Sequence, residues 1–132
     1  MELFDTTFSA VEKALDLRTK RHMLLSSNVA NSETPNYRSR ELDFAGELQK
    51  ALDQNPSPVE KTNPMHLDIG SSQAERIVLD NSGAMGADGN NVDLDIAMGK
   101  LSSNVRAYND AVGYLAMKLR LLRGAITGAA GG

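Results

Sequence analysis

The residues most suggestive of chemistry in this sequence lie in one oxygen-rich stretch, Asp88-Gly-Asn-Asn-Val-Asp-Leu-Asp95. Carboxylate and amide oxygens at this density are typical calcium ligands. An EF-hand loop, however, has Gly at its sixth position and Glu at its twelfth. Counting from Asp88, those positions hold Asp93 and Gly99. The stretch is therefore interpreted as a turn that leads into a helix with acidic residues at its start.

Histidine and cysteine give no better case for a metal or a reaction. The two histidines, His22 and His66, lie 44 residues apart without an HExxH or HxH pattern, and cysteine is absent. The sequence also lacks a Gly-x-Ser-x-Gly elbow, a phosphate-binding loop and a dinucleotide fingerprint. We therefore expect no catalytic residues, no metal, no cofactor and no small-molecule substrate, so the chain is not predicted to be an enzyme.

One group of basic residues stands out. Its members are Arg18, Lys20, Arg21, His22, Arg38 and Arg40. Asp16 lies one helical turn from Lys20, so part of the group is interpreted as an ordinary solvated helix face. The formal net charge of the chain is −3, which does not favour nucleic-acid binding. A contact with an acidic neighbouring protein is the preferred interpretation.

The most distinctive segment runs from Ser27 to Arg38 and reads SNVANSETPNYR. Two asparagines near a helix end can pair with the free carbonyls and the following amides. A proline then disfavours helical backbone before it, an asparagine tolerates left-handed backbone, and a tyrosine offers a ring and a hydroxyl. We expect the helix to end by about residue 31. The residues concerned are Asn28, Asn31, Pro35, Asn36 and Tyr37.

Heptad spacing dominates the C-terminal part of the chain. Ten residues, here called the heptad row, follow one another at alternating gaps of 4 and 3: Leu94, Met98, Leu101, Val105, Tyr108, Val112, Leu115, Leu119, Leu122 and Ile126. An unbroken row of this length predicts a left-handed coiled coil. Acidic residues at 93 and 95 favour a helix start, so we expect a helix over 93–127, about 50 Å long. Residues 128–132 are expected to form a flexible tail.

A thinner stripe accompanies the heptad row. It consists of Ala97, Asn104, Ala111, Tyr114, Leu121 and Ala125. The two stripes together give the helix more adhesive surface than one partner helix can cover. We therefore expect this helix to make contacts on two sides.

Residues 1–31 are expected to contain a second long helix, over 3–31, with a similar but interrupted row. Its apolar members are Phe4, Phe8, Val11, Leu15, Leu25 and Val29. Ser9 and Glu12 have capping-box spacing, although the row begins before them, so the start of the helix stays open. Arg18 and His22 interrupt the row, and because a buried unpaired cation is costly we expect both to face a neighbouring subunit. The two helices are expected to pair as an antiparallel hairpin.

The middle segment, residues 32–92, is expected to be short and irregular. Phe44, Leu48, Ala51 and Leu52 share one face of a short helix. Turns are expected at 55–58 and 63–64, a strand at 77–79 and a loop over 81–91. Aromatic residues make up only 5% of the chain, which suits helix-on-helix packing. The predicted fold class is mainly α, with two long terminal helices forming a coiled coil.

These residues resemble the signature of the flagellar basal-body rod protein family. The family pattern, Ser-Ser-Asn-hydrophobic-Ala-Asn-x-x-Thr-Pro-(Gly/Asn)-Tyr-(Lys/Arg), is matched from Ser26 to Arg38, with Asn36 where Gly is frequent. A second match covers Arg40–Phe44. A third begins at Asp88–Asp95 and continues through the heptad row as far as Ile126. The short length, without an inserted middle domain, is similar to the proximal members of the family.

The resemblance implies a structural subunit that transmits torque and surrounds the export channel. It implies export by the flagellar type III apparatus without a cleavable signal, and a place in the periplasmic rod. Implied partners are copies of the chain, other rod proteins, FliE with the MS ring, and export-gate components, with no nucleic acid and no direct membrane insertion. A coiled-coil adaptor or export chaperone of the flagellar system is the alternative. The candidate assembly residues are the heptad row together with Phe8, Val11, Leu15, Arg18, His22, Leu25, Asn28, Asn31, Pro35 and Tyr37.

Overall fold

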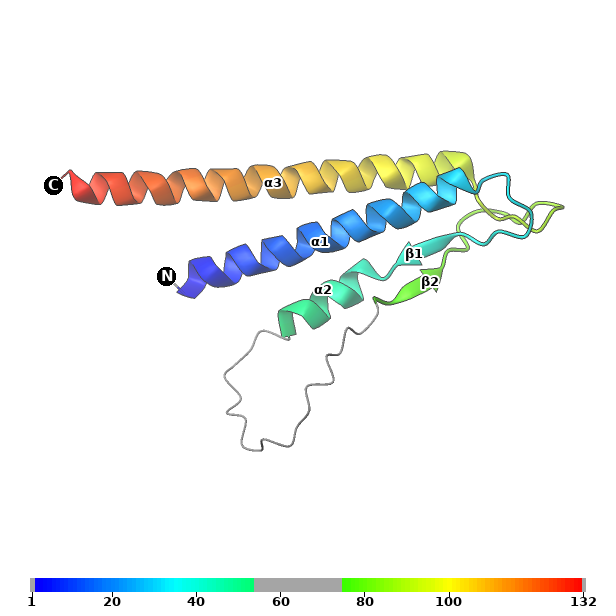
Figure 1. Cartoon of the computed structure of the whole chain (residues 1–132), viewed down its shortest axis with the longest axis horizontal. Coiled ribbons are helices and arrows are strands. Elements are labelled where there is room, and N and C mark those ends of the chain that lie inside the picture. The colour runs from blue at the N-terminus through cyan, green and yellow to red at the C-terminus, as the bar shows by residue number, and fades with distance from the viewer. Residues whose placement is uncertain (1, 54–74, 132) are drawn as a thin grey trace, which may run out of the picture.

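A computed structural model describes residues 2–53 and 75–131. Within them lie, in chain order, α1 (Glu2–Ala30), β1 (Arg40–Leu42), α2 (Phe44–Asp53), β2 (Ile77–Leu79) and α3 (Leu94–Ala130). Figure 1 shows α1 and α3 as long antiparallel helices that lie close at the loop end and diverge toward the chain termini, with α2 on the other side of α1. The prediction of a mainly α fold with long terminal helices and a short middle segment is confirmed. The expected turns at 55–58 and 63–64, and His66, lie outside the described residues.

The two long helices begin differently. Asp93 caps α3, and its carboxylate accepts a hydrogen bond of 3.1 Å from the amide of Ile96. Helix α1, in contrast, runs through Ser9 and Glu12 without a break. The capping-box spacing there is therefore not a helix start, because no residue before it interrupts the helix. None of the described helices is both long enough and apolar enough to cross a membrane.

The helix ends were predicted unequally well. Helix α1 ends at Ala30, as the proline after it predicts. Helix α3 continues to Ala130, so the expectation that residues 128–130 belong to a flexible tail is wrong. Ala has the highest helix propensity of all residues, and Ala125, Ala129 and Ala130 lie in this stretch. The alanines favour helix across a stretch that its glycines suggested would be irregular.

The sheet is a single antiparallel pair in which Glu41 lies opposite Val78. Strand β2 is the strand expected at 77–79. Strand β1 was not predicted, because its three residues include one apolar side chain only and show no alternation. The pairing extends beyond both ends of the strands: the amide of Asp43 donates to the carbonyl of Arg76, and that of Asp80 to Ser39, each at 2.9 Å. The sheet thus ties the chain after α1 to the chain before α3.

The core is small and lies toward the loop end of the hairpin. The buried apolar residues are Leu17, Leu25, Leu42 and Ala97, and the buried polar residues are Asn28, Ser39, Glu47, Asn90, Asn91 and Asn104. None of these residues lies in 5–16 or 105–129. The first half of α1 and most of α3 therefore fold with little apolar burial inside the chain.

This uneven burial predicts uneven amide protection in the purified chain. Hydrogen exchange should show residues 17–30 and 94–104 protected about tenfold or more above residues 5–16 and 112–129, because helices without tertiary packing open readily. Uniform protection along α3 would contradict the prediction.

Candidate assembly surface

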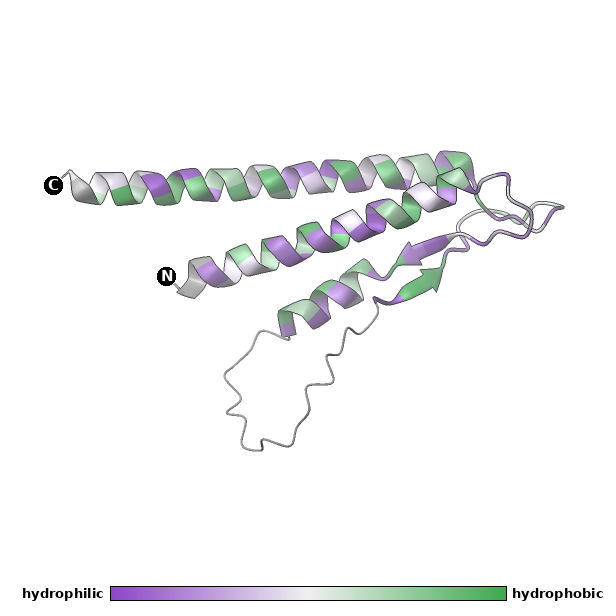
Figure 2. Cartoon of the chain, viewed as in Figure 1, coloured by the Kyte–Doolittle hydropathy of each residue, from purple (hydrophilic) through white to green (hydrophobic). Residues whose placement is uncertain are grey.

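The heptad row of α3 lies mostly beside its contact with α1, not within it. Seven of its members are between 37% and 59% exposed: Leu94, Met98, Val105, Tyr108, Val112, Leu119 and Ile126. The other three, Leu101, Leu115 and Leu122, are half-buried. The thin stripe provides two buried positions, with Ala97 6% and Asn104 1% exposed, whereas its Tyr114 and Leu121 are 39% and 62% exposed. Figure 2 shows hydrophobic residues recurring along all of α3.

Helix geometry explains why the covered face of α3 changes from the thin stripe near its start to the heptad row near its end. A straight α-helix drifts by about 20° per heptad relative to a strict heptad repeat, so a straight partner cannot cover the whole row. Small residues such as Ala97 and Ala111 let α1 approach α3 closely. Val105 and Val112 each directly follow a residue of the thin stripe, so they lie about 100° further round the helix. The row therefore leaves an apolar flank along α3 that its own chain does not cover. Apolar surface on two sides of this helix agrees with the two stripes in the sequence.

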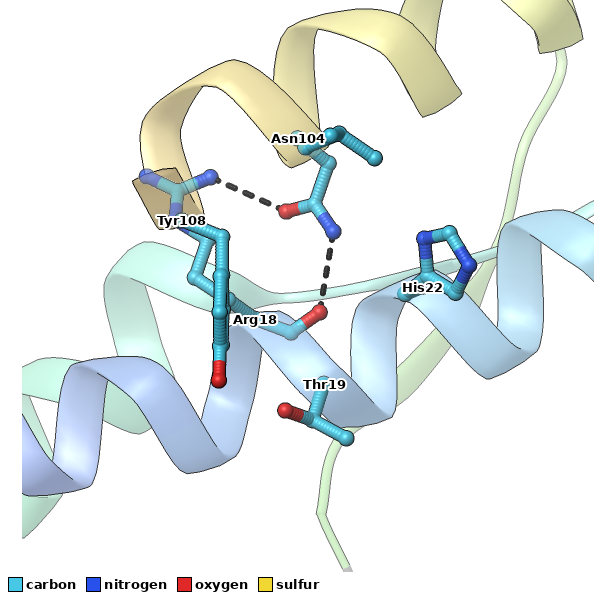
Figure 3. Close-up of a pocket in the computed structure, with 6 residues that line it drawn as sticks. Arg18, Thr19, His22, Asn104 and Tyr108 are labelled. Carbon is cyan, nitrogen blue, oxygen red and sulfur yellow. Dashed lines mark hydrogen bonds between the residues drawn. The ribbon is translucent and has the colours of Figure 1, made fainter. Parts of the chain in front are cut away.

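Arg18 forms the central polar contact between the two long helices (Figure 3). Its Nη1 donates to Oδ1 of Asn104 at 3.3 Å, while Nδ2 of Asn104 donates to the backbone carbonyl of Arg18 at 2.9 Å. The guanidinium also lies 3.9 Å from the centre of the Phe44 ring. The expectation that Arg18 faces a neighbouring subunit is therefore wrong. The partly buried charge is stabilised at this contact, because an amide oxygen accepts a hydrogen bond from the guanidinium and an aromatic ring covers it.

His22 lies on the rim of a groove beside this contact. Two adjoining hollows share His22 and Val105; one extends toward Tyr108 and the other toward Leu101 and Arg106. Figure 3 shows Tyr108 and His22 on either side of Asn104. We call these hollows the side groove. His22 is exposed and lines these hollows together with residues of α3. The expectation that His22 faces away from the intrachain partner helix is therefore wrong.

The end of α1 is joined to β1 by the side chain of Asn28, which is 2% exposed. Its Oδ1 accepts from the amide of Arg40 and from the hydroxyl of Tyr37, each at 3.1 Å, and its Nδ2 donates to the carbonyl of Arg40 at 2.7 Å. Asn31 donates to the carbonyl of Ser27 at 2.8 Å. Asn31 and the hydroxyl of Tyr37 are paired as the sequence predicts, whereas Asn28 pairs with the backbone of β1 and not with the carbonyls of its own helix end.

The loop before α3 closes onto the same helix end. Nδ2 of Asn90 donates to the carbonyls of Asn31 and Thr34 at 2.9 and 2.7 Å. Asn91 accepts from the amide of Ser39 at 2.7 Å and donates to the carbonyl of Asp80 at 2.9 Å. We call this group, with Asn28, the asparagine corner. The sequence indicates residues 88–95 as an oxygen-rich turn and a family match, but it does not assign Asn90 and Asn91 to contacts with the end of α1.

Two residues with positive φ allow the close approach within this corner. Asn36 has φ 60°, the left-handed conformation predicted for it, and Gly89 has φ 79°. A Cβ atom on Gly89 would lie 2.5 Å from Oδ1 of Asn36. The corner therefore requires glycine at 89 both for its backbone angle and for space.

Ion pairs within the chain surround the corner. Arg21 donates to both carboxylate oxygens of Glu41 at 2.8 and 2.9 Å, which raises the pKa of Arg21. Lys100 reaches Asp80 and, at 3.8 Å, Glu41. Burial opposes ionisation of Asp80, but hydrogen bonds from Lys100 and Ser82 outweigh it and lower its pKa.

Two members of the basic group on α1 have acidic partners in their own chain. Besides Arg21 with Glu41, Lys20 pairs with Glu75. The expected acidic neighbour is therefore supplied internally for these two residues. For Arg38 and Arg40, an acidic neighbour stays a prediction.

Comparison with known proteins gives one consistent result. No protein-family model matches the chain. Three relatives each bear the name flagellar basal body rod protein FlgB. That of Bacillus subtilis is 32% identical over 97% of this chain and 98% of its own length, and that of Aquifex aeolicus 30% over 90% and 91%. That of Salmonella typhimurium is 28% identical over 97% of this chain and 98% of its own length.

The asparagine corner can be tested by removing its central side chain. Asn28→Ala leaves the amide and carbonyl of Arg40 and the hydroxyl of Tyr37 without this partner, so we expect a loss of about 2–4 kcal/mol in the free energy of unfolding. Urea unfolding followed by circular dichroism measures it. Asn81→Ala is the matched control, because Asn81 is exposed and makes no side-chain hydrogen bond in the described part of the chain; it should change stability by less than about 0.5 kcal/mol. Equal effects of the two substitutions would contradict the assignment.

Proposed function

The chain belongs to the FlgB family of flagellar basal body rod proteins, structural components of the basal body, and from this premise we propose that it builds the proximal rod by packing its terminal helices against neighbouring subunits. In this role it surrounds the export channel and transmits torque. It reaches the periplasm through the flagellar type III apparatus without a cleavable signal. Its partners are copies of itself, other rod proteins, FliE with the MS ring, and export-gate components.

The observation that carries this proposal is the exposed part of the heptad row. An apolar strip that follows a helix over more than four heptads is far more than scattered surface leucines, and such continuous patches mark interaction sites. Burying each large apolar side chain is worth about 1.5–3 kcal/mol. Covering the row with neighbouring helices would therefore stabilise an assembly strongly, and the side groove beside it offers space for their side chains.

The hairpin is held by contacts at its loop end and is sparsely covered toward its termini, which supports a mechanical role. At the loop end, the asparagine corner fixes α1, β1 and the start of α3 relative to one another. Helix α3 has 37 residues and is about 55 Å long. Beyond Asn104 it has little intrachain cover. A helix of this length, clamped at one end and packed between neighbours elsewhere, can pass a twisting load along its axis.

A single charge placed on or off the row tests the proposal. Val112 is 41% exposed on the row, while Gly113, its neighbour, has nothing within 4 Å of the place where a Cβ would be. We expect Val112→Asp to reduce basal-body yield and motility by about tenfold or more, because a carboxylate would be buried in the assembly. Gly113→Asp should be tolerated.

Recovery of the unsubstituted chain with purified basal bodies provides the accompanying control. An adaptor or chaperone would stay out of that fraction. Normal rods with Val112→Asp would rule out the row as an assembly surface.

A further inference from the structure

The second half of α3 carries positive charge beside the exposed heptad row. Arg120 and Arg123 are exposed and flank Leu119, which is 51% exposed. No acidic residue follows Asp110 in the sequence. Among residues 2–53 and 75–131, neither arginine makes an ion pair. This surface therefore offers an apolar strip with a basic border to whatever covers it.

The first half of α1 carries the opposite charge. Asp5, Glu12 and Asp16 follow at gaps of 7 and 4, which places them on one face of the helix, and all three are exposed. Within the described residues, none of the three takes part in an ion pair. In Figure 1 the start of α1 and the end of α3 lie at the same end of the molecule. Val11 and Leu115 line one hollow, so Glu12 and Asp16 lie level with the middle of α3, while Arg120 and Arg123 lie nearer its terminal end.

The acidic and basic stripes form no ion pair with each other within the described part of one chain. Val11 and Leu115 line one hollow between α1 and α3, so both face the intrachain contact. At about 100° per residue, Asp16 lies about 140° round the helix from Val11, and Arg120 lies the same angle from Leu115. Both charged residues therefore point away from the helix to which they are closest. In these positions both are open to solvent, where charges of another chain can reach them.

We propose that the second half of α3 is covered by the first half of α1 from a second copy of this chain, with Glu12 and Asp16 of one copy paired to Arg120 and Arg123 of the other. This inference rests on the proposed function, since it names the occupant of the same surface. The acids are four residues apart and the arginines three, about 6 and 4.5 Å along their axes. Repeated from copy to copy with opposite surfaces, such a contact builds a ring or an open polymer.

Two charge-reversed chains test the pairing. One carries Arg120→Glu with Arg123→Glu, and the other carries Glu12→Lys with Asp16→Lys. In each, both stripes have the same sign, so copies repel; together, each chain complements the other. Produced alone in cells without the original chain, each should lower basal-body yield about tenfold or more, and co-production should restore it to within about threefold. Glu33→Lys, an exposed residue off both stripes, is the charge control and should have no effect.

Two results would overturn the pairing. One is normal rods from either reversed chain alone, and the other is failure of co-production to restore them. In either case, loss of rods with Val112→Asp would still support the proposed function, so the two failures are distinguishable.

Cross-linking gives a second measurement that does not depend on the reversed chains. The chain has no cysteine, so one copy with Glu12→Cys and another with Arg120→Cys can be joined only between copies. Basal bodies that contain both should yield a cross-linked heterodimer with a bis-maleimide reagent, because the backbones of a Glu–Arg ion pair lie further apart than a disulfide can reach. Glu33→Cys combined with Arg120→Cys should yield none. Absence of the Glu12–Arg120 product would overturn the proposal.

Discussion

The hydrogen bonds of Asn28 are the constraint on which the rest of this structure depends. One amide side chain, 2% exposed, joins the end of α1 to the backbone of β1 and to the hydroxyl of Tyr37. Because β1 pairs with β2, and the chain after β2 leads into α3, fixing that one helix end also fixes where α3 begins. Asn90 and Asn91 close the arrangement from the other side. The direction of two long helices thus follows from a few amides at their common end.

Away from this corner, the chain is organised for contacts that it does not make alone. Leu25 and Ala97 are buried near the loop end, but nothing in residues 105–129 is. The Arg18–Asn104 pair is the last buried link between α1 and α3 toward the termini. Beyond it the two helices diverge, and their apolar and charged faces stay open. The assembly that we propose requires this asymmetry, since a subunit that buried its own heptad row would leave none of it for neighbours.

Local signals allowed the helices to be predicted, whereas their relative placement required information distant in sequence. Pro35 and Asp93 mark helix boundaries through the geometry of adjacent residues, so one sequence is enough to find them. The face of α3 that meets α1 depends on Arg18 and Asn104, which are 86 residues apart, and no spacing rule connects them. Strand β1 escaped prediction because three residues carry too little pattern. Asn90 and Asn91 escaped because their partners are backbone groups, which a sequence does not display.

The asparagine corner is made of neutral groups, so its hydrogen bonds depend little on pH or on salt. Amides and backbone carbonyls neither gain nor lose protons over any physiological range of acidity, and ions in solution screen them little. The amide contacts of the corner should therefore keep their strength in compartments of different pH and ionic strength. The ion pairs of Arg21 with Glu41 and of Lys100 with Asp80, like the exposed charged groups of the outer faces, will respond to both. The helix ends are thus held by one set of contacts that ignores the surroundings and another that follows them.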